Sequence, residues 1–351
     1  MSSRERLSYA IKIVASHGLY YLGLLQLWQS IVLRRKAVVL MYHRVLTVDE
    51  RRETGSHPAL VVDRETFGRQ MAFLKRRFVV LSIEEFAERM EKKIPFPTSS
   101  CIITFDDGWR DNFTNALPVL WQHRLPALIF LPMNYIGHHR LFWQEALVHL
   151  LVRVVTEVRR NPLRRERFAL LLAPAQLEAV LDLGEDDPRR WIIGTVSAQK
   201  RLTRTAVERL VAALADALGV RLEDLSTIDG FIDWGQVDAM ARQGITFGGH
   251  GVEHLLLTQA SSDETATEIR GSKAVMDDRL SDTVPTFSYP NGYWTQDVAA
   301  EVKAAGYRLA FIAQGGPVTC TDDPLTLRRV NIHESVTDTT PMFLARLVGL
   351  F

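Results

Sequence analysis

The sequence has little of several features that define protein classes. Its only two cysteines, Cys101 and Cys320, are too few for a disulfide framework and favour a reducing compartment. The 42 basic and 41 acidic residues leave a net charge of +1, which gives no indication of a nucleic-acid partner. With 351 residues, 47% of them hydrophobic, the chain is long enough for one large α/β domain, alone or with an insertion.

The N-terminal region also lacks a signal-peptide pattern and a long apolar run. Residues 18–33 are apolar but contain polar side chains such as Gln29, and a membrane span needs about 20 mostly apolar residues. We therefore expect a cytoplasmic protein in which this stretch is an amphipathic helix packed on its own domain. The alternative is a helix lying on the inner face of the cytoplasmic membrane, with aromatic and basic residues at the interface, namely Tyr20, Tyr21, Trp28, Arg34, Arg35 and Lys36.

Short apolar runs recur along the chain, each ending in polar residues or glycine. Continuous apolarity indicates strands that are covered on both faces, as in a parallel sheet or barrel. Helix-period segments lie between several of them, at residues 64–77, 83–93, 262–280 and 295–306. This alternation predicts an α/β fold, a distorted (β/α) barrel of seven or eight strands. The predicted strands are residues 38–42, 79–83, 101–105, 127–131, 245–247, 285–289, 309–313 and 327–332.

The alternation stops between residues 137 and 230. This region is rich in Leu, Ala, Arg and Glu, and we expect helices at residues 143–159, 174–183 and 197–218. It is predicted to be a helical insertion, either a lid over the site or a stabilising subdomain that faces away. The predicted organisation is an N-terminal helical segment (1–36), a barrel (37–136 and 231–351) and the insertion (137–230).

Two of the apolar runs end in residues suited to a metal site. Asp106 and Asp107 follow the run at 101–105, and His250 and His254 follow the run at 245–249. A spacing of four residues lets both imidazoles converge on one metal from a helical turn. An Asp and two His can hold a catalytic divalent metal with a position open for water, while a second Asp acts as base. The two segments together predict a metal-dependent hydrolase.

Three motifs carry a resemblance to a known family. Residues 104–108 (Thr-Phe-Asp-Asp-Gly) match the first motif of the polysaccharide deacetylases, the NodB-homology or carbohydrate esterase family 4 group. Residues 250–254 look like its His-Ser/Thr-x-x-His motif, with Gly251 in place of the hydroxyl residue. Residues 287–292 are similar to its Arg-x-Pro-Tyr-Gly motif, but Ser288 stands where Arg would be. The resemblance covers residues 38–135 and 233–334.

The resemblance implies a deacetylase that removes an N- or O-acyl group from an amino-sugar glycan of a surface polysaccharide, or from its soluble or lipid-linked precursor. Asp107, His250 and His254 would ligate the metal, Zn²⁺ first, with Co²⁺, Ni²⁺ or Fe²⁺ as alternatives. Asp106 would be the general base. The backbone N–H of Asn291 would support the oxyanion, beside the other residues of the third motif, Tyr289 and Pro290.

The general acid has two candidates. His43, in a Tyr-His segment like that of exopolysaccharide deacetylases, is preferred over His333, which lies where the last motif would place a His. The missing motif-three Arg leaves Asp106 dependent on another partner, and no fourth motif (Asp-x-x-x-Trp) follows Gly306. Both departures resemble the exopolysaccharide branch. Sugar rings are expected to stack on aromatic residues, Trp143 first among Trp109, Trp143, Tyr293 and Trp294.

Three other functions are weighed against this one. A sugar N-deformylase would use the same site on a smaller acyl group. A carbohydrate-binding protein could retain the barrel after its chemistry has decayed, but the intact Asp107, His250 and His254 argue against decay. A glycosidase could use the Asp pair as acid and base, but the two histidines would then be unexplained. The oligomeric state cannot be predicted from the sequence.

Overall fold

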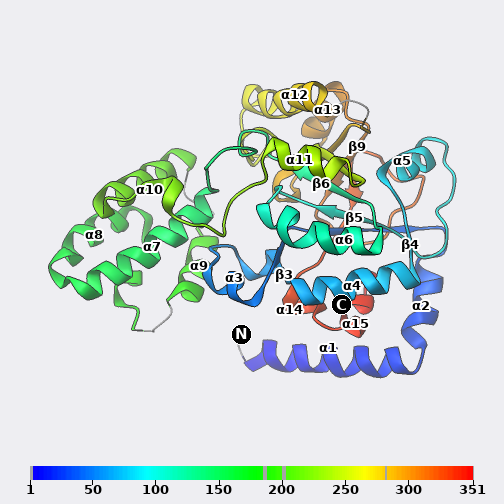
Figure 1. Cartoon of the computed structure of the whole chain (residues 1–351), viewed down its shortest axis with the longest axis horizontal. Coiled ribbons are helices and arrows are strands. Elements are labelled where there is room, and N and C mark those ends of the chain that lie inside the picture. Colours follow the sequence, from blue (N-terminus) through cyan, green and yellow to red (C-terminus); the bar gives the residue numbers. More distant parts are fainter. Residues whose placement is uncertain (1–2, 185–187, 200–202, 281–282, 351) are drawn as a thin grey trace. The chain divides into compact units, whose positions relative to one another are not determined.

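The computed structural model describes residues 3–184, 188–199, 203–280 and 283–350 (Figure 1). Contacts divide the chain into two compact units, which are described separately. The first comprises Met1–Thr47, Pro58–His138 and Phe231–Phe351, and the second comprises Val48–His57 and His139–Gly230. The N-terminal helices, predicted as a separate segment, therefore group with the barrel.

The first unit is built around one parallel sheet. Its strands follow the order β10-β9-β8-β7-β6-β5-β1-β11, and β4 pairs with β5 beside this path. Only Arg329 separates β10 from β11, so a single short segment forms both ends of the path and the sheet nearly closes on itself. The predicted distorted (β/α) barrel is confirmed. The strands are β1 (Ala37–Tyr42), β4 (Val79–Val80), β5 (Ser100–Phe105), β6 (Ala127–Leu131), β7 (Ile245–Gly249), β8 (Thr286–Ser288), β9 (Leu309–Ile312), β10 (Leu327–Arg328) and β11 (Val330–Asn331).

The burial of the strands explains their composition. Every residue of β1, β5 and β6 is buried, as the continuous apolar runs predicted. The run at 79–83 is an exception, since β4 ends at Val80 and Ser82 then caps a helix through a capping box with Glu85. A separate pair, β2 (Arg44–Leu46) and β3 (Val61–Asp63), follows β1. The helices of this unit include α4 (Arg64–Arg77), α5 (Ile83–Glu91), α6 (Leu117–His123), α11 (Trp234–Ala241), α12 (Ser262–Arg279), α13 (Gln296–Ala304), α14 (Glu334–Thr337) and α15 (Thr340–Leu347).

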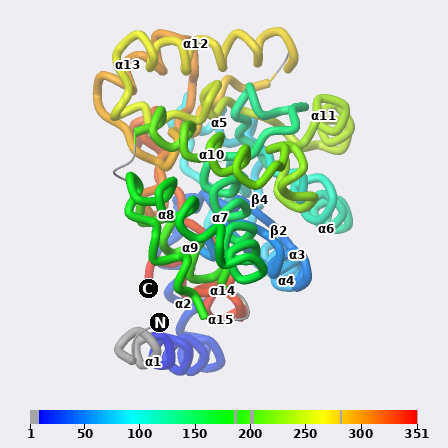
Figure 2. Tube along the Cα trace, turned by 90° about the vertical axis from the view of Figure 1, so that its left-hand side faces the viewer, coloured from blue at the N-terminus to red at the C-terminus, as the bar shows by residue number. Residues whose placement is uncertain are grey.

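Two helices precede the barrel. α1 (Ser3–Tyr21) packs against α15, and α2 (Leu24–Val32) leads into β1 (Figure 2). The predicted single stretch at 18–33 is interrupted because Gly23 adopts a φ of 75°, a left-handed conformation that favours glycine. Among the described residues, no helix combines the length and the apolar character needed to cross a membrane.

The second unit is helical, and α9 and α10 each pack on α7 around an apolar core. Its helices are α3 (Val48–Glu53), α7 (Trp143–Arg160), α8 (Arg165–Leu172), α9 (Arg189–Ser197) and α10 (Arg204–Leu218). Residues 174–183 form two 3₁₀ segments, Ala173–Ala175 and Glu178–Asp182, instead of the predicted helix. The helix predicted at 197–218 is also wrong at its start, since Ser197 ends α9 and Thr203 caps α10; residues 200–202 lie outside the described part.

Candidate metal centre

The three predicted metal ligands lie together at the carboxyl ends of β5 and β7. Oδ1 of Asp107 lies 3.4 Å from Nε2 of His250 and 3.4 Å from Nε2 of His254. One ligand atom from each residue lies within 4.8 Å of the others. Tetrahedral ligands bonded at 2.0–2.1 Å are about 3.4 Å apart, so the two carboxylate–imidazole distances suit a divalent ion. The donor set of one carboxylate and two imidazoles suits zinc and its neighbours.

Two of these ligands have unusual backbones. Asp107 has a φ of 75° and His254 a φ of 55°, and such left-handed conformations in non-glycine residues often occur at functional sites. The predicted helical turn from 250 to 254 is wrong, because these residues form a loop. The loop still brings the two imidazoles together, with ring centroids 4.8 Å apart. Gly251, with a φ of 79°, is the residue that lets the chain turn back after β7.

Neighbouring residues hold two of the candidate ligands, His250 and Asp107, and orient the atoms that face the site. Nδ1 of His250 lies 2.7 Å from the carbonyl oxygen of Ser288, and because a carbonyl only accepts, Nδ1 carries a proton. Burial by itself lowers the pKa of His250, but Asp106 and Asp107 outweigh it and raise this pKa, and in the neutral ring Nε2 is the atom left to bind a metal. Nε1 of Trp109 donates to Oδ2 of Asp107 at 2.9 Å. Trp109 is fully buried, so its predicted contact with a sugar is wrong; its indole N–H holds the Asp107 carboxylate instead.

The charges of the cluster favour metal binding. Burial by itself raises the pKa of Asp107, but the nearby His250 and His254 outweigh it and hold this pKa far below its ordinary value. Burial lowers the pKa of His254 to about 4, although the Asp107 carboxylate opposes this. An ionised carboxylate and a neutral imidazole are the forms that bind a cation.

Asp106 faces a different partner, Arg329. Nη1 and Nη2 of Arg329 donate to Oδ1 and Oδ2 of Asp106, both at 2.7 Å, and Nη2 also donates to Oγ of Ser288 at 2.8 Å. Burial raises the pKa of Asp106, but the Arg329 guanidinium and His250 outweigh it, so the pKa lies below its ordinary value. Arg329, which lies between β10 and β11, therefore supplies the guanidinium that the family motif would place at position 288.

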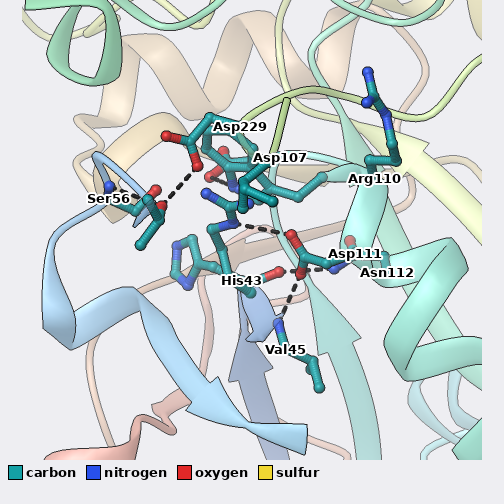
Figure 3. A network of polar contacts seen from close by, with 12 residues as sticks. His43, Val45, Ser56, Asp107, Arg110, Asp111, Asn112 and Asp229 are labelled. Carbon is teal, nitrogen blue, oxygen red and sulfur yellow. Dashed lines mark hydrogen bonds and ion pairs between the residues drawn. The ribbon is translucent and has the colours of Figure 1, made fainter. Parts of the chain in front are cut away.

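His43 lies beside Asp106 at the end of β1. Its Nε2 is 3.9 Å from Oδ2 of Asp106, and burial lowers its pKa. Figure 3 shows how His43 and the following strand β2 are held: Asp111 accepts from the backbone N–H of Val45 at 2.7 Å, and Nδ2 of Asn112 donates to the His43 carbonyl at 2.8 Å. These contacts fix the backbone that carries the imidazole.

His333 follows β11, the strand next to β1. Met41 pairs with Asn331 in parallel register, so His333 comes two residues later at the same edge of the sheet as His43. Both histidines are half-buried. The roles of the two as alternative general acids stay predictions.

The third motif contributes backbone more than side chains. Tyr289 is fully buried and its hydroxyl donates to the carbonyl of Leu325 at 3.0 Å, so a substrate contact by this hydroxyl does not fit. Pro290 is buried, whereas Asn291 is exposed with a φ of 55°. The oxyanion role of the Asn291 N–H stays a prediction. So does sugar stacking by Trp143, which lies in the second unit and packs against its apolar core.

The loop that carries His254 is held by a residue that sequence analysis missed. The Glu268 carboxylate, on α12, accepts from the backbone N–H groups of Val252 at 2.9 Å and Glu253 at 3.0 Å. A Cβ added at Gly251 would lie only 2.6 Å from Oε2 of Glu268. The carboxylate thus fills the space in which a serine or threonine side chain would stand.

Comparisons with known proteins agree with this geometry. A family model described as "Polysaccharide deacetylase" matches residues 93–169 and 193–310, more than half of the chain. YxkH of Bacillus subtilis, named as a polysaccharide deacetylase, is 19% identical over 298 residues, 85% of this chain and 71% of that protein. The poly-beta-1,6-N-acetyl-D-glucosamine N-deacetylase of Staphylococcus epidermidis is 35% identical over 113 residues, 30% of this chain and 38% of that enzyme.

Two solved structures share the fold. The Streptococcus pyogenes deacetylase PplD, in complex with acetate, matches with a TM-score of 0.56 and 17% identity over 89% of this chain and 98% of its own. IcaB from Ammonifex degensii matches with a TM-score of 0.55 and 16% identity over 89% of this chain and 97% of its own.

Proposed function

Since the chain belongs to the polysaccharide deacetylase family, we propose that it removes N-acetyl groups from an amino sugar of an exopolysaccharide by metal-dependent hydrolysis. The observation that carries the proposal is the position of Oδ1 of Asp107, 3.4 Å from Nε2 of both His250 and His254, beside the Asp106 carboxylate. The local similarity to the staphylococcal N-deacetylase supports the substrate class.

Asp107, His250 and His254 would hold the metal, with Zn²⁺ first and Co²⁺, Ni²⁺ or Fe²⁺ as alternatives. A divalent ion bound there would lower the pKa of a bound water toward neutrality. The protein contributes a fixed ligand orientation: in neutral His250 the proton on Nδ1 faces the Ser288 carbonyl, which leaves Nε2 as the atom that would bind the metal.

Asp106 takes the proton from the attacking water. Its carboxylate is ionised because the buried Arg329 holds both of its oxygens, and the same contact fixes its orientation. An ionised, fixed carboxylate next to the ligand cluster is suited to act as a general base. In the reaction, the water oxygen adds to the acyl carbon and the carbonyl oxygen becomes an oxyanion, toward which the Asn291 N–H would donate.

The C–N bond then breaks, and the leaving nitrogen needs a proton. His43 is the proposed donor because its Nε2 lies 3.9 Å from Oδ2 of Asp106, the proposed base. The products are acetate and the free amino sugar. His333 is the alternative donor on the neighbouring strand.

The test measures acetate release from N-acetylglucosamine oligosaccharides with β-1,6 linkage by the metal-loaded protein, with metal content measured on the same sample. The expected result is one metal per chain and acetate release that chelation abolishes. D106N should retain the metal and lose turnover, whereas H254A should lose both. Bound metal without turnover on any acylated amino sugar would indicate a binding protein, and formate release from N-formyl sugars alone would indicate a deformylase; either would overturn the proposal.

A further inference from the structure

Helix α2 presents an apolar stripe to solvent. Its four residues occupy positions i, i+3, i+4 and i+7, a spacing that places them on one face of the helix. Gln29 lies on the opposite face, buried, where its Nε2 donates to Oγ of Ser99 at 2.9 Å. The helix therefore buries Leu25 and Gln29 and turns four large apolar side chains outward, which is unusual for a surface helix. The stripe consists of Leu24 (46% exposed), Leu27 (59%), Trp28 (46%) and Ile31 (57%).

The stripe is part of a larger concentration of exposed apolar side chains. Tyr21 and Leu22, just before α2, are 79% and 75% exposed, and Ile11 and Val14 of α1 are also exposed. Of the nineteen large apolar side chains exposed in the described part of the chain, eight lie between residues 11 and 31. Single exposed apolar residues are ordinary, but a concentration of them marks an interaction site.

The charges next to this face along the chain have one sign. Arg34 and Arg35 follow α2 directly and are exposed, and their side chains make no hydrogen bond or ion pair with the described residues. No acidic residue occurs between Glu5 and Asp49, whereas Lys12, Arg34, Arg35 and Lys36 are all basic. Apolar residues that include Trp and Tyr, with arginines beside them, suit the interface of an anionic bilayer.

We propose that α2, with Tyr21 and Leu22, docks on the surface of an anionic lipid bilayer. The apolar stripe enters the interface, and Arg34 and Arg35 meet lipid phosphates. α2 lies before the start of β1, whereas His43 and the metal ligands lie beyond strand carboxyl ends. The six residues of β1 separate the two ends by about 20 Å, so docking on α2 leaves the site open to the aqueous side. The proposal stands independently of the proposed reaction.

Co-sedimentation of the full chain with vesicles tests it. Phosphatidylcholine vesicles with and without phosphatidylglycerol are compared, at low salt and at high salt. The variants are L27S/W28S, which removes apolar area, and R34E/R35E, which reverses the charge. Their matched controls are L163S/W121S, which replaces exposed apolar residues of α6 and the second unit, and R167E/R209E, which reverses two exposed arginines of the second unit. Circular dichroism establishes that each variant is folded.

The expected result is binding to phosphatidylglycerol vesicles that weakens at high salt and falls about tenfold or more in both α2 variants, with the controls unchanged. Absence of binding by the wild-type chain, or equal loss in the controls, would overturn the proposal. Self-association that L27S/W28S abolishes, without vesicle binding, would assign the face to a second copy of the chain and would also overturn it.

Discussion

Arg329 donates two parallel hydrogen bonds to Asp106, each 2.7 Å long, although the two residues are 223 positions apart. The pair is fully buried, and Ser288, which stands where the third motif would have an arginine, accepts a bond from the same guanidinium. Asp106 therefore has a cationic partner, supplied from the strand segment that nearly closes the barrel instead of from the third motif.

Replacement of Arg329 should shift the pH dependence of the reaction. Arg329 lowers the pKa of Asp106, and the base must be ionised to act, so R329Q should move the acid limb of kcat/KM to higher pH. R329K keeps the charge without the bidentate geometry and should show a smaller shift. The measurement is kcat/KM against pH at saturating metal.

The same substitution is expected to cost stability, because it leaves a buried carboxylate unpaired, at about 3–5 kcal/mol. Thermal unfolding of R329Q and R329K separates this effect from the kinetic one. An unshifted acid limb in a folded R329K and R329Q would contradict the role of Arg329 in tuning the base.

The loop of the second motif should not tolerate a side chain at Gly251. Its φ is 79°, and a Cβ there would meet Oε2 of Glu268 at 2.6 Å. G251S should therefore displace the loop and weaken metal binding by about 10- to 100-fold, the cost typical of losing a group that orients a metal ligand. G68S is the matched control, since no atom lies within 4 Å of a Cβ at Gly68. Calorimetric titration with Zn²⁺ checks this, and equal affinities in G251S and G68S would contradict it.

Trp109 should affect the metal site although it cannot touch a substrate. W109F keeps most of the buried ring but removes the 2.9 Å hydrogen bond to Asp107. We expect metal affinity to fall about 10- to 100-fold with the fold intact. W121F, at an exposed tryptophan, is the control. Unchanged zinc affinity in W109F would show that this hydrogen bond does not orient the ligand.

His43 and His333 can be distinguished by their kinetics. Loss of a general acid commonly costs about 10²- to 10⁴-fold in rate, so H43Q should lower kcat by that order while KM and metal content change little. H333Q should change kcat far less. The reverse ranking in acetate-release assays would transfer the acid role to His333.

The fold follows from local patterns in the sequence, and the departures have physical reasons. Buried parallel strands appear as continuous apolar runs, so β1, β5 and β6 are predicted almost to the residue. The strand predicted at 79–83 is too long, because the apolar pattern extends to Ile83, the first residue of α5. The N-terminal helix breaks at Gly23, where one left-handed residue outweighs the apolar pattern around it.

The candidate ligands are also visible in the sequence, because Asp107, His250 and His254 each follow a strand. Their supporting residues are not. Arg329 and Glu268 act across the fold on residues far away in the chain, and only the register of the closed sheet and the packing of α12 bring them near. The one available signal was an arginine pair, Arg328 and Arg329, inside an otherwise apolar run.

The most direct test of the metal centre is a crystal structure of the zinc-loaded protein with anomalous diffraction measured at the zinc edge. The account predicts one strong peak within about 2.0–2.2 Å of an Asp107 carboxylate oxygen and of Nε2 of both His250 and His254. A protein that binds no zinc, or a peak that lies away from these three residues, would contradict it.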